Sequence, residues 1–275
     1  MNDSYRGSLD SVYNFICITN EKDMEDLCGQ LKSCRSFAVD TETTGFDPVK
    51  CDCIGVSVCI QEGVSFYIPF GHSTGEQLSK AQVVKYFKPI FENEKIEKYL
   101  HNAVFDMEFL YAMGIDLKGL AFDSLVAARC VATRKRRNGL KYLSEEYFNE
   151  TMIDFKEAVT DNGYKDFSEV PLELATKYAA ADAHQTLKLT RVLSKELEEK
   201  DMQCFYYQKE LPAVEEKYQI KKKRLASKMR ESQLSPGSCS ESEIQGSLFA
   251  TTSHKRHRDE KLFSNKRRKI DNSIF

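Results

Sequence analysis

The chain has 275 residues, of which 41% are hydrophobic, enough to bury a core in one or two domains. Residues 221–275 carry 14 Lys and Arg against 6 Asp and Glu, whereas residues 1–220 carry 26 against 36. No apolar run approaches the roughly 20 residues of a membrane-spanning helix, and the polar N-terminus lacks the order of a secretion signal. These features exclude a membrane protein and predict an acidic, intracellular body with a basic tail.

The nine cysteines predict reduced thiols rather than disulfides or a zinc site. None belongs to a C-x-x-C pair, and no set of Cys and His follows at zinc-binding spacing. Free thiols are the usual state of cysteine inside cells. Disulfide frameworks and zinc modules are therefore excluded as the basis of the fold.

Strands predominate in the first hundred residues, after a polar lead at residues 1–11. Residues 13–19 predict a strand, and Met24, Leu27 and Leu31 recur at the spacing of a helix that Asn20 or a neighbour would cap. Further strands are predicted at residues 36–42, 54–60 and 63–69, the last two joined by a turn. A helix at about 79–92 and a short strand near 96–100 follow.

The rest of the domain is predicted to be helical. Apolar residues recur every three or four positions in residues 103–113, 122–132, 140–148, 171–181 and 183–200. Strands followed by helices, with one helix between the first two strands, are typical of an α/β fold with one mixed sheet. The predicted domain spans residues 12–205.

The composition changes at about residue 206. Residues 206–230 predict a charged helix or the remnant of a domain junction, and residues 231–275 predict a disordered basic tail. Two basic clusters in residues 255–269 have the pattern of a bipartite nuclear-import signal, and equally of a nonspecific nucleic-acid arm. The expected location is nuclear in a nucleated cell and cytoplasmic in a bacterium.

Asp40 and Glu42 stand two residues apart where the strand-forming segment SFAVDTE becomes polar. Because side chains alternate along a strand, both carboxylates lie on one face. Adjacent carboxylates repel unless a cation lies between them, and oxygen ligands suit Mg²⁺ or Mn²⁺. Ordinary charges at a solvated strand end are the alternative.

Two further segments hold candidate polar residues. Asp106 stands at the start of a predicted helix, where an acid can serve only to compensate the helix dipole. Tyr178 and Asp182 stand four apart in a predicted helix, so the phenol and the carboxylate share one face. Taken alone, Tyr178 is also typical of a core aromatic.

Together, the segments D-T-E-T-T-G, N-x-x-x-F-D and Y-x-x-x-D resemble the three exonuclease motifs of the DEDD nuclease superfamily, in its tyrosine-bearing branch. The likeness to the proofreading domain of bacterial-type DNA polymerase I covers about residues 13–205 and extends to Y-L-H-N-A-V-F-D and G-L-A-F-D-S-L. It implies a ribonuclease H-like mixed β-sheet flanked by helices. That family continues into a polymerase domain, whereas this chain turns basic and stops, which predicts a free-standing or truncated exonuclease.

The resemblance also implies the chemistry of the site. It predicts 3′→5′ hydrolysis of phosphodiester bonds with two divalent cations, Mg²⁺ or Mn²⁺, and release of nucleoside 5′-monophosphates. Asp40, Glu42 and Asp182 would hold the tighter cation, Asp40 would bridge to the second, and Asp106 would support that second site. Tyr178 would orient the attacking water.

Nucleic-acid contacts are expected around this centre. The resemblance places the backbone of Thr41 and Thr43 near the terminal nucleotide, Phe46 as a wedge against its base, and Asn102 in the second motif. A basic cluster between the second and third motifs is the candidate for gripping the phosphate backbone, with a solvated loop as the alternative. Its members are Arg134, Lys135, Arg136, Arg137 and Lys141.

Two other functions remain open from the sequence. A ribonuclease D-like enzyme that trims RNA 3′ ends uses the same carboxylates, although T-E-T-T-G-F-D favours the polymerase-type branch. A catalytically inactive domain that binds nucleic acid or a protein is disfavoured, because all five active-site positions are filled. The expected partner is DNA with a single-stranded 3′ end, with RNA and a separate polymerase as further candidates.

Overall fold

The computed structural model of the protein describes residues 9, 12–132 and 137–234. Three members of the predicted basic cluster, Arg134, Lys135 and Arg136, lie outside the described residues. The same holds for most of the predicted N-terminal lead, for residues 235–275, and hence for the predicted import signal.

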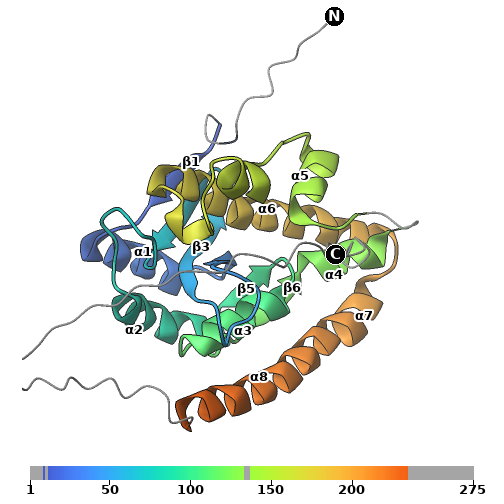
Figure 1. The fold of residues 1–275 in the computed structure, drawn as a ribbon. Helices are drawn as coiled ribbons and strands as arrows, with labels where there is room; N and C mark the ends of the chain where they lie inside the picture. Colours follow the sequence, from blue (N-terminus) through green and yellow to red (C-terminus); the bar gives the residue numbers. More distant parts are fainter. Residues whose placement is uncertain (1–8, 10–11, 133–136, 235–275) are drawn as a thin grey trace, which may run out of the picture. The chain divides into compact units, whose positions relative to one another are not determined.

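One mixed sheet forms the centre of the fold (Figure 1). Its order is β1-β4-β3-β2-β5-β6. β2, β3 and β4 form an antiparallel meander, while β5 pairs in parallel with β2 and β6, and β1 pairs in parallel with β4. The strand bounds are β1 Asn14–Cys17, β2 Ser36–Thr43, β3 Cys53–Gln61, β4 Val64–Pro69, β5 Glu97–Leu100 and β6 Leu120–Asp123.

Helices follow the strands in the order that the sequence predicts. Asn20 caps the first of them by accepting a hydrogen bond from the backbone N–H of Asp23 at 3.0 Å, which confirms the predicted cap. No helix in the described ranges is both long and apolar enough to cross a membrane. The helices are α1 Glu21–Ser33, α2 Lys80–Phe91, α3 Ala103–Ala112, α4 Ser124–Val131, α5 Leu140–Phe148, α6 Leu172–Glu199, α7 Gln203–Phe205 and α8 Leu211–Leu234.

The side-chain alternation of β2 divides the core into two layers. Phe37 and Val39 belong to the cluster formed with α1, α2 and α3, whereas Ala38 packs against Ala183 of α6. The alanine-rich face of α6 lets that helix approach the sheet closely. Because Asp40 and Glu42 have the same parity as Ala38, they project toward α6.

Three of the predicted helices are wrong in detail. The helix expected at 122–132 begins only at Ser124, because β6 precedes it and Asp123 ends that strand. The Asp123 carboxylate caps α4 by accepting from the N–H groups of Leu125 and Val126. The two helices predicted at 171–181 and 183–200 form the single helix α6, whose 28 residues include no Gly or Pro.

The α8 helix packs against the body. Val214 and Tyr218 are buried in the main core, and the Tyr218 hydroxyl donates to Asp116 at 2.7 Å. Lys222 forms an ion pair with the same carboxylate at 2.6 Å. The compact unit ends at Ser232, so it includes α8 as well as the predicted 12–205 domain, and residues 231–234 of the predicted tail are helical.

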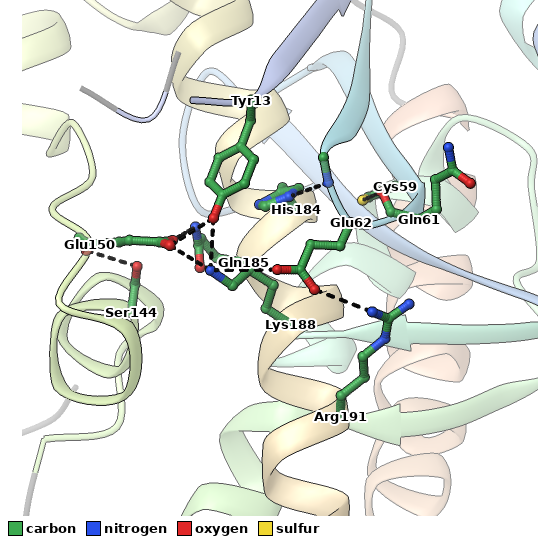
Figure 2. Close-up of polar contacts among 11 residues, drawn as sticks. Tyr13, Cys59, Gln61, Glu62, Ser144, Glu150, His184, Gln185, Lys188 and Arg191 are labelled. Carbon is green, nitrogen blue, oxygen red and sulfur yellow. Dashed lines mark hydrogen bonds and ion pairs between the residues drawn. The ribbon is translucent and has the colours of Figure 1, made fainter. Parts of the chain in front are cut away.

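A polar network anchors α6 on the sheet (Figure 2). Glu150 lies at its centre and accepts hydrogen bonds from Tyr13 at 2.7 Å, Gln185 at 2.7 Å and Lys188 at 2.6 Å. Next to it, the buried His184 accepts from the backbone N–H of Gly63 at 3.0 Å. These α6 residues lie within two helical turns after Asp182. The network therefore fixes the rotation of α6, the helix that carries Tyr178 and Asp182.

Candidate active site

Three carboxylates converge between β2 and α6. Asp40, Glu42 and Asp182 each place one oxygen within 4.8 Å of the other two, which confirms that the pair on β2 shares a face. Glu42 and Asp182 are only 8% and 9% exposed. Within the part of the chain that the structure describes, Glu42 Oε1 and Asp182 Oδ1 are buried without a hydrogen-bond partner. Such orphaned oxygens fit a divalent cation with oxygen ligands.

The electrostatics of the trio are those of a cation site. Desolvation raises the pKa of Asp40 well above its usual range, and the charges of Asp106, Asp182 and Glu42 raise it further. Desolvation also raises the pKa of Glu42, with a further contribution from Asp182, and the pKa of Asp182 itself. Without a cation the site therefore favours protonated carboxyl groups.

Asp106 lies beside the trio but outside it. Its carboxylate accepts hydrogen bonds from the backbone N–H of Thr41 at 3.0 Å and from the Thr41 hydroxyl at 2.7 Å. Burial raises the pKa of Asp106 to about 7, while these hydrogen bonds from Thr41 lower it. Of the charges near Asp40, that of Asp106 raises its pKa most. Asp106 thus borders the site with a fixed orientation, and its support of a second cation stays a prediction.

Tyr178 combines a packed ring with a position at the site. Its ring packs on Phe167 with centroids 5.0 Å apart, and the Lys141 ammonium lies 3.6 Å from its centre. Burial, followed by the charge of Asp182, keeps the pKa of Tyr178 far above its ordinary value. The phenol therefore stays protonated at neutral pH, which suits it to hydrogen bonding rather than to acting as a base.

Of the basic cluster predicted to grip the phosphate backbone, the structure describes Arg137 and Lys141, and their surroundings differ. Arg137 is exposed. Lys141, on α5, instead points its ammonium at the acidic centre, where it donates to the backbone carbonyl of Ile153 and lowers the pKa of Glu42 and Asp182. The contact of either residue with nucleic acid stays a prediction. Sequence spacing carries no signal for this placement of Lys141, which depends on how α5 packs against α6.

Asp123 is a buried residue that the sequence motifs do not identify as part of the site. It is 2% exposed and accepts hydrogen bonds from the backbone N–H groups of Asn102 at 3.2 Å and Ala103 at 2.9 Å, besides capping α4. Asn102 adopts the left-handed backbone conformation, with φ of 69°, at the start of α3. The Asp123 carboxylate thus holds the N-termini of two helices, one of which carries Asp106. An acid directly before a helical run was the available signal.

Thr43 and Phe46, two further predicted nucleic-acid contacts, lie at the end of β2 and in the loop that follows it. Thr43 donates its hydroxyl to the backbone carbonyl of Gly45 at 2.8 Å, which shapes the loop after β2. In that loop Phe46 is 83% exposed, and its ring meets Phe105 edge-on at 6.3 Å. Phe46 lies three residues after the end of β2, the strand that carries Asp40 and Glu42.

A mixed sheet of this order, with carboxylates on β2 and on the helix that crosses it, defines the ribonuclease H-like class of nuclease folds. The catalytic core of RRP6 from Trypanosoma brucei superposes with a TM-score of 0.57 at 16% identity, over 74% of this chain and 52% of that one. NrnC of Brucella melitensis gives 0.51 at 19% identity, over 86% and 98%. At these identities the likeness concerns the fold alone.

Within that class the sequence defines the family. Residues 15–198 match the family described as 3′–5′ exonuclease, and the chain belongs to it, as its three motifs predict. DNA polymerase I of Chloroflexus aurantiacus is 39% identical over 198 residues, covering 70% of this chain and 20% of that protein. The Pseudomonas aeruginosa enzyme is 31% identical over 176 residues, covering 62% and 19%. The chain thus spans about a fifth of the length of these relatives.

The raised pKa of Asp106 predicts that this group destabilises the metal-free protein as pH rises. Between its ordinary pKa of about 3.9 and the folded value of about 7, the folded state binds more protons than the unfolded state. The contribution of Asp106 to the free energy of unfolding, on the order of 4 kcal/mol, is therefore present at low pH and lost as pH rises through 7. We expect wild type to lose stability relative to Asp106→Asn between pH 5 and 8, measured by denaturant unfolding with a chelator.

The comparison with Asp106→Asn is needed because other groups titrate nearby. Desolvation lowers the pKa of the partly exposed His101 and of the buried His184 to about 4, and both contribute to stability in the opposite sense below pH 6.5. Asp52→Asn, at a carboxylate that is 77% exposed, serves as the control and should follow wild type. Equal pH profiles for wild type and Asp106→Asn would contradict the prediction. Adding Mg²⁺ should stabilise wild type more at higher pH, because cations bind the deprotonated carboxylates.

Proposed function

We propose that the protein is a 3′→5′ exonuclease that hydrolyses phosphodiester bonds at the 3′ end of DNA and releases nucleoside 5′-monophosphates. One observation carries the proposal. In a chain of the 3′–5′ exonuclease family, Asp40, Glu42 and Asp182 converge on one point, and Glu42 and Asp182 each have an orphaned oxygen there. Tyr178 stands one helical turn from Asp182. This arrangement supports an active site rather than a nucleic-acid-binding domain without activity.

Each residue of the site has its own expected role in hydrolysis. Two bound divalent cations would generate the attacking hydroxide and neutralise the leaving 3′ oxygen. Asp40, Glu42 and Asp182 would hold the first, and Asp40 together with Asp106 the second. Thr41 keeps the Asp106 carboxylate aimed through two hydrogen bonds. Tyr178 keeps its proton, so its hydroxyl would orient the attacking water by a hydrogen bond.

The choice of DNA rests on the relatives in which this segment occurs. The proteins that match at 39% and 31% identity are DNA polymerases, which supports a DNA 3′ end as the substrate and a polymerase as a functional partner. Trimming of RNA 3′ ends is the alternative that the same carboxylates allow, and a direct comparison of substrates separates the two.

The test is degradation of 5′-labelled oligonucleotides of one sequence. Single-stranded DNA, DNA duplex with a 3′ overhang, and RNA are incubated with Mg²⁺, Mn²⁺ or EDTA. We expect a ladder that shortens from the 3′ end on DNA, slower shortening of RNA, and no products with EDTA. A 3′-phosphorylated strand controls for the direction of attack. Internal cleavage, or hydrolysis in EDTA, would refute the proposal, and faster hydrolysis of RNA would transfer it to RNA.

A further inference from the structure

A groove lies between α8 and the loop that follows β2. It has a volume of about 290 Å³ and is lined by residues 46–49 of that loop, by Glu108 of α3 and by one face of α8. Figure 1 shows α8 as a long helix running past α3 at the edge of the body. Tyr218 and Leu225, both buried, fix which face of α8 is turned toward the groove.

The face of α8 that lines the groove is basic. Lys221, Arg224 and Lys228 contribute to the lining and stand at positions i, i+3 and i+7, so they share one side of the helix. At a rise of 1.5 Å per residue the row extends over about 10 Å of helix. Arg224 and Lys228 are exposed. This spacing presents a line of cations rather than a single point charge.

The positive charge in the groove is not cancelled by its acidic residues. Glu108 is occupied by Lys221, with a distance of 2.6 Å between their charged atoms. Asp47 accepts a hydrogen bond from the backbone of Val49 and lies 4.0 Å from the Lys50 ammonium. Within residues 12–132 and 137–232, no ion pair joins Arg224 or Lys228 to an acid. These two cations are available to an external anion.

An exposed aromatic ring completes the lining of the groove, on the loop that follows the strand carrying Asp40 and Glu42. Phe46 lines it, is 83% exposed, and rests edge-on against Phe105, the residue before Asp106. A basic track beside an exposed ring is the combination that binds single-stranded nucleic acid, because phosphates meet the cations and bases stack on the ring. An acidic peptide would use the cations but has no planar bases to stack on Phe46.

We propose that this groove holds the single strand upstream of the 3′ end, with Arg224 and Lys228 on its phosphates and Phe46 against a base. The inference rests on the proposed exonuclease function and extends it, since it assigns the path of the substrate outside the metal-binding residues.

Binding of fluorescent oligo-dT of 4 and 16 nucleotides to the full chain in EDTA tests this path. Arg224→Ala/Lys228→Ala should weaken binding of the 16-mer about 10-fold and reduce the slope of log K against log salt by about 1.4, or 0.7 for each lost phosphate contact. The 4-mer, which occupies mainly the acidic centre, should bind as it does to wild type. Lys22→Ala/Lys32→Ala, at two exposed lysines on α1, is the matched control and should change neither value.

The same variants separate the groove from the chemistry. In hydrolysis of the 16-mer with Mg²⁺, Arg224→Ala/Lys228→Ala should raise KM about 10-fold and leave kcat unchanged, with the helix content checked by circular dichroism. Phe46→Ala should weaken 16-mer binding roughly 5- to 100-fold, the value of one stacked base.

If wild type hydrolyses DNA but the double variant binds the 16-mer with unchanged affinity and salt slope, the groove is not the path. If poly-glutamate binds wild type as tightly as oligo-dT does, and Arg224→Ala/Lys228→Ala weakens its binding by the same factor, the groove is a site for an acidic protein instead. Failure of wild type to hydrolyse any substrate would refute the proposed function, while the binding comparison would still decide the groove.

Discussion

Asp40→Asn and Asp182→Asn should each reduce hydrolysis of single-stranded DNA by at least about 1000-fold, the scale on which a bound metal ion lowers a barrier by several kcal/mol. Each change keeps the shape of the side chain and removes one negative charge from the trio whose oxygens lie within 4.8 Å of one another. An amide is a weaker ligand for a hard cation than a carboxylate. The rate is measured under single-turnover conditions at saturating Mg²⁺.

These variants should keep their fold. The trio is strained without a cation, because desolvation raises the pKa of Asp40 and of Asp182, and the charges of Asp106, Asp182 and Glu42 raise that of Asp40 further. Removing one charge relieves that repulsion, so the metal-free variants should unfold at or above the temperature of wild type. A low rate combined with unchanged or higher stability would assign the loss to the site itself and not to misfolding.

Asp52→Asn is the matched control for both variants. Asp52 precedes β3, its side chain is 77% exposed, and its partner is Lys80 at 3.4 Å on the surface. The same chemical change there should leave the rate within a factor of about two, since an exposed ion pair contributes little. If Asp40→Asn or Asp182→Asn keeps more than about a tenth of the wild-type rate, the assignment of these residues to a two-cation centre is wrong.

Local periodicity predicts each half of the acidic centre separately. The period of two along β2 places Asp40 and Glu42 on one face, and the spacing of four along α6 places Tyr178 beside Asp182. Each rule needs only neighbours in the sequence. That these two faces meet required the resemblance to known exonucleases, because no local pattern says that α6 crosses β2.

The features that escaped prediction depend on contacts between distant segments. Lys141 belongs to a basic run in the sequence, yet its ammonium lies over Tyr178, 37 positions away in the numbering. The sequence predicts a charged helix or junction remnant for the segment with Lys221, Arg224 and Lys228, and no local pattern shows that this helix packs on the body through the buried Tyr218 and Leu225. β6 spans only four residues, too few for alternation to distinguish a strand from the first turn of the following helix.

Tyr178→Phe should lower the hydrolysis rate roughly 10- to 1000-fold, the range for one hydrogen bond made in a transition state. The ring contacts should survive, since Phe167 packs on the ring with centroids 5.0 Å apart and the Lys141 ammonium lies over the ring, 3.6 Å from its centre. The hydroxyl keeps its proton, because burial and the charge of Asp182 hold the pKa of Tyr178 far above neutrality. The rate of Tyr178→Phe should therefore have the same pH dependence as that of wild type between pH 6 and 9, and only its magnitude should fall.

The expected signature of Tyr178→Phe is a lower kcat with unchanged affinity for Mn²⁺, measured by titration calorimetry. A hydroxyl that orients water contributes to the reaction step, whereas a cation ligand would change Mn²⁺ binding as Asp182→Asn should. Tyr86→Phe removes a surface hydroxyl that donates to Glu25 at 3.0 Å and should leave both values unchanged. An unchanged kcat for Tyr178→Phe would make Tyr178 a packing residue of the α6 face. A parallel loss of Mn²⁺ affinity would instead place its oxygen among the cation ligands.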